Sequence, residues 1–178
     1  MNSKEDLCSL IEESPLTLIG YTFKDERIKD ELISNFNYVE IKEIDSSFSF
    51  KSFLRNEKLN QVLDSGKEFD YILLDLNNIR PTYDGVSKWD KSSFIRNVLE
   101  KLRERIWVEG EPQYKIIITS PVHNGPNDDI GSFIGGNQPI YMSDLVVVLI
   151  SEIARVIKNK NGGEGDYILY NTKQSVEI

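Results

Sequence analysis

One carboxylate in the sequence stands where metal-dependent nucleotide chemistry needs it. Asp75 ends the apolar run 71–75 (Tyr-Ile-Leu-Leu-Asp), which is typical of a buried strand that delivers its last side chain to the carboxyl edge of a sheet. A carboxylate in that position can hold a hydrated Mg²⁺ beside the phosphates of a nucleotide. The sequence therefore contains one candidate Mg²⁺ ligand. An acid that simply ends a strand at a surface loop is the plainer interpretation.

The phosphate-binding loop that usually accompanies such a strand is missing. A loop of the form G-x-x-x-x-G-K-[ST] surrounds phosphates with backbone N–H groups. Before Gly66 the only glycine is Gly20, so this pattern cannot be written upstream of Asp75. The sequence therefore predicts a nucleotide site that the chain cannot complete alone.

Composition is that of a folded, soluble protein of one domain, and it excludes several kinds of site. The chain has 178 residues, of which 39% are hydrophobic and 28% charged, with a net charge of −8. One cysteine, Cys8, excludes an internal disulfide, and one histidine, His123, excludes a Cys/His zinc site. No apolar stretch approaches the roughly 20 residues of a membrane span, and no signal peptide is recognisable, so a cytoplasmic location without membrane contact is expected. The negative charge argues against non-specific nucleic-acid binding by the surface as a whole.

Hydrophobic spacing predicts helices that alternate with strands, and then consecutive strands. Helical spacing covers residues 1–14, 24–35, 50–64 and 92–107, and strand-like runs cover 16–21, 38–44, 71–75, 116–120, 144–150, 154–158 and 167–170. Two long polar segments, 77–90 and 121–138, lie between these elements. This order predicts an α/β fold with a mainly parallel sheet and an antiparallel C-terminal edge hairpin.

The order and spacing of these elements resemble the RecA/RadA recombinase core and its DnaB-type helicase relatives. The most specific matches are Gly135-Gly136-Asn137, which closes the second polar loop, and the run Val-Ile-Lys-Asn-Lys at 156–160. The resemblance covers residues 16–170 and implies a three-layer RecA-like core in a single domain over 1–178, with an N-terminal helix at 1–14 and a tail at 171–178. In this resemblance Asp75 matches the Walker B aspartate.

The resemblance also gives roles to the polar loops and to two lysines. Residues 77–91 take the place of the first DNA-binding loop and residues 121–137 that of the second. Candidate contacts of these loops with single-stranded DNA or a partner protein are Arg80, Tyr83, Lys88, Trp89, Lys91, His123, Gly135, Gly136 and Asn137. Lys158 and Lys160 match lysines that in RecA reach the neighbouring subunit's nucleotide, where a cation neutralises charge on the transferred phosphoryl group. A solvated hairpin with alternating lysines is the plainer interpretation.

Three parts that hydrolysis requires in that family are absent. The Walker A loop, which should precede Leu16 in this alignment, cannot be found. The place of the catalytic glutamate falls at Gly20 or Thr22, and neither side chain can act as a general base toward water. The polar residue that senses the nucleotide falls at Pro121. An autonomous ATPase is therefore not expected.

The expected function is that of a non-catalytic RecA-like protein, a subunit or regulator in DNA recombination, repair or replication. Lys158 and Lys160 would act in trans on a RecA-type or helicase-type ATPase in a hetero-oligomer. Mg-ATP would bind at the interface with that partner, and no cofactor would bind to this chain alone. Two alternatives stay open: one piece of a split ATPase whose phosphate loop is on another chain, and a structural interaction module that binds no nucleotide.

Overall fold

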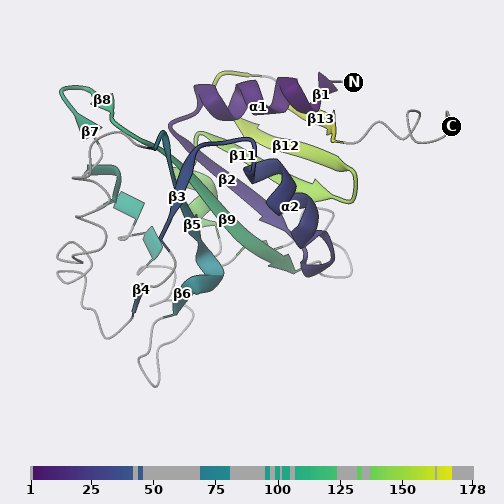
Figure 1. Ribbon diagram of the computed structural model, residues 1–178, viewed down its shortest axis with the longest axis horizontal. Helices are drawn as coiled ribbons and strands as arrows, with labels where there is room; N and C mark the ends of the chain where they lie inside the picture. The colour runs from purple at the N-terminus through teal and green to yellow at the C-terminus, as the bar shows by residue number, and fades with distance from the viewer. Residues whose placement is uncertain are drawn as a thin grey trace, which may run out of the picture.

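One nine-stranded sheet organises the described part of the chain (Figure 1). The computed structural model describes residues 2–41, 44–45, 69–80, 95–96, 99–100, 102–104, 107–123, 132–133, 137–162 and 164–169. Within these ranges, no helix is long and apolar enough to cross a membrane.

The parallel strands of the sheet are arranged on both sides of its first long strand, β2. Their spatial order is β3 (Tyr38–Glu40), β5 (Tyr71–Asp75), β9 (Lys115–His123), β2 (Leu16–Tyr21) and β11 (Leu145–Ile150). The chain leaves β2 for the outer strand β3, returns through β5 and β9, and then crosses to β11 on the other side. The strand order therefore reverses at β2.

The C-terminal strands continue this sheet in the antiparallel sense. β12 (Ile153–Asn159) pairs antiparallel with β11 and with β13 (Gly165–Ile168), and β1 (Asn2–Ser3) adds to β13 in parallel. β10 (Ser132–Phe133) pairs antiparallel with the end of β9. The predicted fold class is thus confirmed: an α/β fold with a mainly parallel sheet and antiparallel C-terminal strands.

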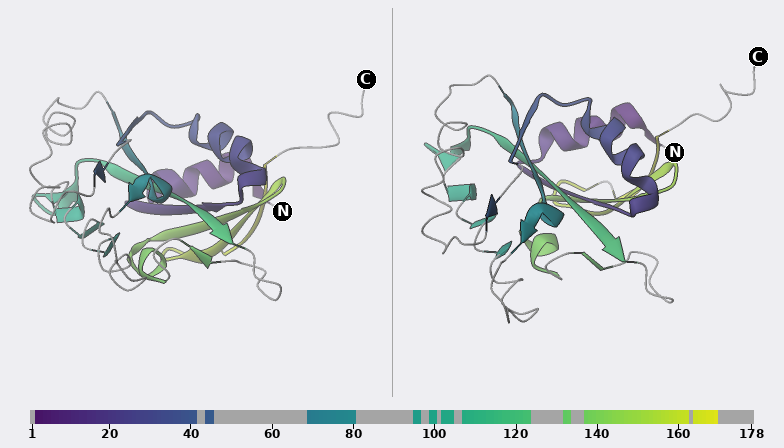
Figure 2. Two further views of the ribbon diagram at one scale, coloured as in Figure 1. Left: turned by 90° about the horizontal axis from the view of Figure 1, so that it is seen from below. Right: turned by 60° about the horizontal axis from the view of Figure 1, so that its bottom comes forward.

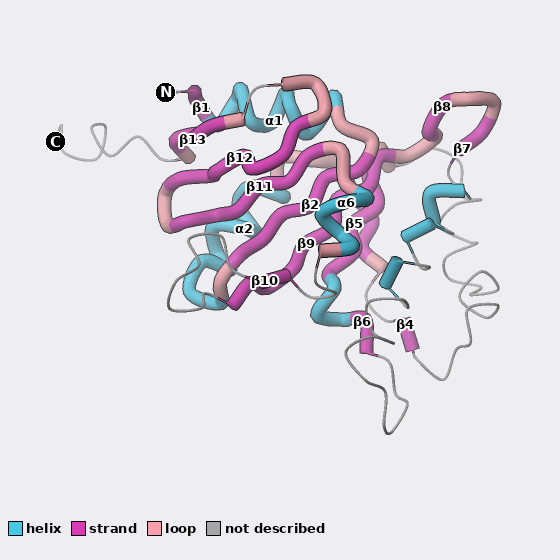
Figure 3. The backbone as a smooth tube through the Cα atoms, turned by 180° about the vertical axis from the view of Figure 1, so that it is seen from behind, coloured by secondary structure: helices cyan, strands magenta, loops and turns pink. Residues whose placement is uncertain are grey.

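Helices cover both faces of the sheet, as the views from below and from behind show (Figures 2 and 3). α1 (Lys4–Glu13) and α2 (Glu26–Ile33) lie on one face, where Leu7, Ile11 and Leu32 pack in one core cluster with Ile19. On the other face lie α6 (Gln138–Met142) and the helical residues described between 95 and 104. The strands β2, β5, β9 and β11 each contribute side chains to a core cluster on each face of the sheet, because successive residues of a strand point to opposite faces.

Several predicted element boundaries are wrong. The predicted strand 38–44 is two short strands, β3 and β4 (Ile44–Asp45), and β4 pairs in parallel with β6 (Ile79–Arg80). The helix predicted to end at 107 ends earlier, because Trp107 begins β7 (Trp107–Val108), which pairs with β8 (Glu111–Pro112) across a turn with positive φ angles at 109 and 110.

The predicted second loop is also partly strand. β9 continues to His123, because Pro121 pairs with the last residue of β2 and the next two residues pair with β10. The last predicted strand is displaced to 165–168. The predicted helix at 50–64 and the tail at 171–178 lie outside the described residues.

Candidate functional site

Asp75 lies at the carboxyl end of β5, and groups of its own chain already surround it. The Tyr21 hydroxyl donates a hydrogen bond of 2.9 Å to Asp75 Oδ2, and the backbone N–H of Asn77 donates one of 2.8 Å to Oδ1. Lys29 Nζ lies 3.9 Å from Oδ2, and the Asp75 side chain is 13% exposed. Both carboxylate oxygens therefore have partners within the chain.

Lys29 brings a buried positive charge to this cluster. Its side chain is 9% exposed, and its Nζ lies 3.2 Å from Asp30 Oδ1 and 4.4 Å from the centre of the Tyr21 ring. A buried ammonium is stable only with such compensation, here two carboxylates and an aromatic face. Burial, the charge of Asp75 and the hydrogen bond to it raise the pKa of Tyr21 well above its usual value. The chain thus places its own cation beside the carboxylate for which Mg²⁺ is predicted.

The space beside this cluster is small. A cavity of about 130 Å³ opens there. Its polar and charged lining residues include Lys29, Asp30, Tyr38, Glu40, Asp75 and Thr119. That volume holds a few water molecules, at about 30 Å³ each. No set of three or more His, Cys, Asp or Glu side chains in the described ranges is arranged to hold a metal ion. Mg²⁺ binding at Asp75 remains a prediction.

The reversal of strand order at β2 indicates where a phosphate loop would be found. Ligands of open α/β sheets bind at the carboxyl ends of the strands beside such a reversal, and a phosphate loop joins a strand to the N-terminus of a helix. In this chain β2 is joined to α2 by residues 22–25, which contain the 3₁₀ turn η1 (Phe23–Asp25) and no glycine. The strand order therefore gives this connection, and not the segment before Leu16, as the place where a phosphate loop would lie.

The N-cap residue of α2 at this connection is an aspartate, although its side chain makes no hydrogen bond to the N–H groups of the helix. Asp25 is 7% exposed and is the residue before the first turn of α2. Its Oδ2 accepts hydrogen bonds from Thr22 Oγ1 at 3.0 Å and from the backbone N–H of Ser151 at 3.3 Å. A helix N-terminus favours a negative group, and here that group is part of the chain. A phosphate that approached this position would meet a carboxylate.

Gly20 and Thr22, the positions that the sequence alignment offers for the catalytic glutamate, lie on β2 and on the connection where the strand order puts a phosphate loop, so the strand order supports neither position. Both residues are used by packing or hydrogen bonding. A Cβ atom on Gly20 would lie 2.7 Å from Phe133 Cε1 and 3.0 Å from Val122 Cγ1. Phe133, from β10, therefore fills the space that a side chain at position 20 would need. The hydroxyl of Thr22 is bound to Asp25. Pro121, at the predicted sensor position, is a residue of β9 opposite Tyr21.

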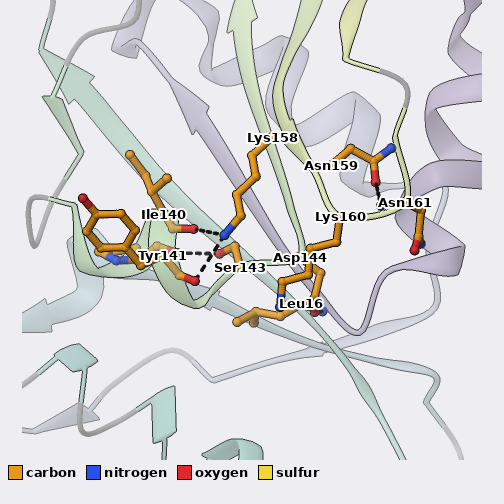
Figure 4. A network of polar contacts seen from close by, with 10 residues as sticks. Leu16, Ile140, Tyr141, Ser143, Asp144, Lys158, Asn159, Lys160 and Asn161 are labelled. Atoms are coloured by element: carbon orange, nitrogen blue, oxygen red, sulfur yellow. Dashed lines mark hydrogen bonds and ion pairs between the residues drawn. The ribbon is translucent and has the colours of Figure 1, made fainter.

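Lys158 and Lys160 lie together at the opposite, amino edge of the parallel strands (Figure 4). Lys158 pairs with Val146 near the start of β11. Its Nζ donates to two backbone carbonyls at the end of α6, those of Ile140 at 2.9 Å and Tyr141 at 3.2 Å. The ammonium of Lys158 therefore holds the C-terminal end of α6, where the helix dipole favours a cation.

Lys160 makes an ion pair with Asp144. The Lys160 Nζ lies 2.9 Å from Asp144 Oδ1, and the two side chains are 51% and 11% exposed. Asp144 Oδ2 also accepts a hydrogen bond of 3.0 Å from the backbone N–H of Leu16. Burial and the nearby Lys160 charge lower the pKa of Lys158, and Asp144 offsets part of this effect. Both lysines thus have partners within the chain, and Lys160 is the more exposed of the two.

The other predicted site residues are scattered or not described. Asn137 is exposed, precedes α6 and makes no side-chain capping bond. The predicted loop residues Arg80 and His123 belong to strands, β6 and the end of β9. The remaining predicted contacts lie outside the described residues: Tyr83, Lys88, Trp89, Lys91, Gly135 and Gly136.

Sequence reasoning missed two charged residues, Lys29 on α2 and Asp25 just before it. Lys29 and Asp25 are spaced with the buried Leu32 and Ile33 along one helix face, at i, i+4, i+7 and i+8. Charged residues on the apolar face of a helix are a readable signal, because such residues are almost never fully buried without a partner. The partner of Lys29, Asp75, could not be read from α2 itself.

Comparisons with known proteins leave the family of this chain open. No protein-family model and no curated protein sequence matches it. Among solved structures it is similar to one described as "Crystal structure of the RadB recombinase", with a TM-score of 0.46 and 13% sequence identity over 96% of this chain and 100% of that chain. The fold class stated above rests on the strand order of the chain itself and not on this loose similarity.

Proposed function

We propose that this chain is a non-catalytic protein of RecA-like architecture, a subunit or regulator in DNA recombination, repair or replication that works through a partner ATPase. The proposal rests on one observation above all, the occupied carboxyl edge of its sheet. Asp25 stands at the N-terminus of α2, and the ammonium of Lys29 stands beside Asp75.

These internal charges oppose binding of Mg-ATP in cis. A phosphate at the N-terminus of α2 would have to displace or neutralise Asp25, and a divalent ion at Asp75 would have to displace the buried Lys29 ammonium. Separating a buried ion pair costs about 3–5 kcal/mol. The same charges oppose the split-ATPase alternative, because a phosphate loop on another chain would meet the same occupied edge.

The lysines are better placed for a neighbour than for their own chain. Lys158 and Lys160 belong to the amino edge, whereas Asp75 ends a strand at the carboxyl edge. A cation from one chain can neutralise a phosphoryl group held by another. We propose that Lys160, whose side chain is 51% exposed, makes this contact and that Lys158 holds α6 in position beside it.

The proposal is tested with the purified chain and with recombinase-type and helicase-type ATPases from the same source. Calorimetric titration with Mg-ATP is expected to show no binding to the chain alone. The chain is expected to associate with one of the ATPases and to change its ATP turnover, and Lys160→Ala is expected to abolish the change in turnover. Lys24→Ala, which removes an exposed lysine from η1, is the matched control. Circular dichroism shows whether Lys158→Ala disturbs the fold.

Two outcomes would contradict the proposal. ATP hydrolysis by the chain alone would contradict the non-catalytic role. Failure to associate with either type of ATPase, or to alter its turnover, would remove the partner role. The second candidate, a structural interaction module without nucleotide, is favoured by the intrachain partners of both lysines, and it predicts association that Lys160→Ala leaves unchanged together with unaltered turnover.

A further inference from the structure

A second cavity lies at the amino edge of the sheet, away from Asp75. Its volume is about 440 Å³, within the usual range of ligand pockets. It lies between the ends of α1 and α2 and the starts of β5 and β9. The residues that matter for its chemistry are Glu12, Asn35, Phe36, Asp70, Tyr71 and Lys115.

The surroundings of this cavity are negatively charged. Glu12, in the last turn of α1, and Asp70, just before β5, both line it, and both are exposed to solvent. The C-terminal ends of α1 and α2 also meet there, and neither helix has a basic residue in its last turn. Helix C-termini carry partial negative charge and favour cations. Lys115 is the single basic residue among those that line the cavity.

An aromatic wall with an unused hydroxyl group completes the cavity. Tyr71 and Phe36 are 5% and 7% exposed, and their ring centres lie 5.1 Å apart in an edge-to-face arrangement. Among the described residues, the Tyr71 hydroxyl has no hydrogen-bond partner. Burial first, and then the charges of Glu12 and Asp70, raise the pKa of Tyr71 to about 12, so both carboxylates act on this hydroxyl. The ring of Tyr71 is buried, but its hydroxyl faces the cavity, where a ligand or water can reach it.

The Tyr71 ring of this aromatic wall already contacts a cation, the ammonium of Lys115. Its Nζ lies 5.5 Å from the centre of the Tyr71 ring, within the range of a cation–π contact. The ring face is thus already used, whereas the two carboxylates are not paired with Lys115 in any ion pair between described residues. A second positive group would therefore be held by the carboxylates and not by the ring.

We propose that this cavity binds a guanidinium or ammonium group on an apolar stem, as presented by an arginine or lysine side chain of a partner protein. Glu12 and Asp70 would accept its N–H groups, the Tyr71 hydroxyl would accept another, and the stem would pack against Phe36. The inference does not depend on the function proposed above, because it concerns other residues at a different part of the sheet.

The experiment compares two short peptides that differ only in charge. A blocked Gly-Arg-Gly peptide and the same peptide with neutral citrulline in place of arginine are titrated into the full chain and followed by NMR chemical shifts. Only the arginine peptide is expected to bind. Glu12→Gln and Asp70→Asn are each expected to weaken binding about 3-fold, and the double variant about 10-fold, because each removes an exposed ion pair that contributes up to about 1 kcal/mol. Glu13→Gln is the matched control, because Glu13 is as exposed as Glu12 but does not line the cavity; it is expected to change affinity by less than about 1.5-fold.

Three results would overturn the proposal. They are equal binding of the citrulline peptide, equal weakening by Glu13→Gln and Glu12→Gln, and no binding of the arginine peptide at millimolar concentration. Free arginine amide separates the two sources of the cation: weaker binding than the peptide supports a partner's side chain, and equal binding overturns that source in favour of a small amine.

Discussion

Replacing Asp75 with asparagine distinguishes two roles of this carboxylate: stabilising the fold, or binding a metal ion. The substitution keeps the shape of the side chain and removes its charge. Lys29 would then lose one of its two carboxylate partners inside the protein, and Tyr21 would lose a charged acceptor at 2.9 Å. If Asp75 is structural, as its contacts indicate, Asp75→Asn destabilises the folded chain.

The expected magnitude follows from these contacts. A hydrogen bond to a charged group contributes about 1.5–3 kcal/mol, and breaking a buried ion pair costs about 3–5 kcal/mol. Lys29 keeps Asp30 at 3.2 Å, and asparagine still accepts one hydrogen bond, so the loss should lie near the lower end. We expect a decrease of about 2–4 kcal/mol in the free energy of unfolding. The matched control is Glu31→Gln, which removes another carboxylate of α2 whose partner Arg27 is 90% exposed; it should cost at most about 1 kcal/mol.

Urea unfolding, monitored by circular dichroism in EDTA and again in excess Mg²⁺, measures both quantities. The wild-type chain should be equally stable in the two buffers. The structural interpretation would be refuted if Asp75→Asn were as stable as the wild type in EDTA while Mg²⁺ stabilised only the wild type. That pattern is expected of a metal site, where neutralising Asp75 would relieve its repulsion by neighbouring carboxylates and so offset the lost contact with Lys29.

Three further predictions concern buried groups in the sheet. Burial raises the folded-state pKa of Tyr71 to about 12, so the stability that its neutral hydroxyl contributes is fully present below the unfolded pKa of about 10 and is lost as the pH rises through 12. Ultraviolet titration measures this pKa, and unfolding at alkaline pH measures the loss of stability. Tyr71→Phe should lose less stability over the same pH range. Gly20→Ala should destabilise the chain by about 1–3 kcal/mol in urea, and by less in a Phe133→Leu background, because Phe133 Cε1 leaves only 2.7 Å for the new methyl group. Thr17→Val should raise the free energy of unfolding by about 1 kcal/mol in thermal melts, since Thr17 Oγ1 is buried without a hydrogen-bond partner among the described residues.

The elements that could be predicted from the sequence are those whose local pattern decides their structure. The short continuous apolar runs of β5 and β11 are typical of strands that are buried on both faces. α1 begins at a capping box formed by Ser3 and Asp6 and ends before Pro15, so local signals mark both of its ends.

The rest depends on contacts between distant parts of the chain. The sequence predicts Asp75 at the end of its strand, but its hydroxyl partner Tyr21 is 54 residues away in sequence. The continuation of β9 through Pro121 depends on pairing with β2 and β10. Lys158 and Lys160 are a recognisable pair in the sequence, whereas their partners, the end of α6 and Asp144, depend on the fold.

Lys158 and Lys160 lie at one edge of the sheet and Asp75 at the opposite edge. This arrangement limits the symmetry of any assembly in which the lysines contact a neighbour's carboxyl edge. A twofold symmetric contact joins identical surfaces, so it would bring lysine edge against lysine edge. A contact that brings the lysines to a neighbour's carboxyl edge is instead head-to-tail. Because the carboxyl edge of this chain already carries Asp25 and Lys29, the chain could offer its lysines to one neighbour without serving as the acceptor for another. Such a molecule would occupy the end of a head-to-tail assembly and not its interior.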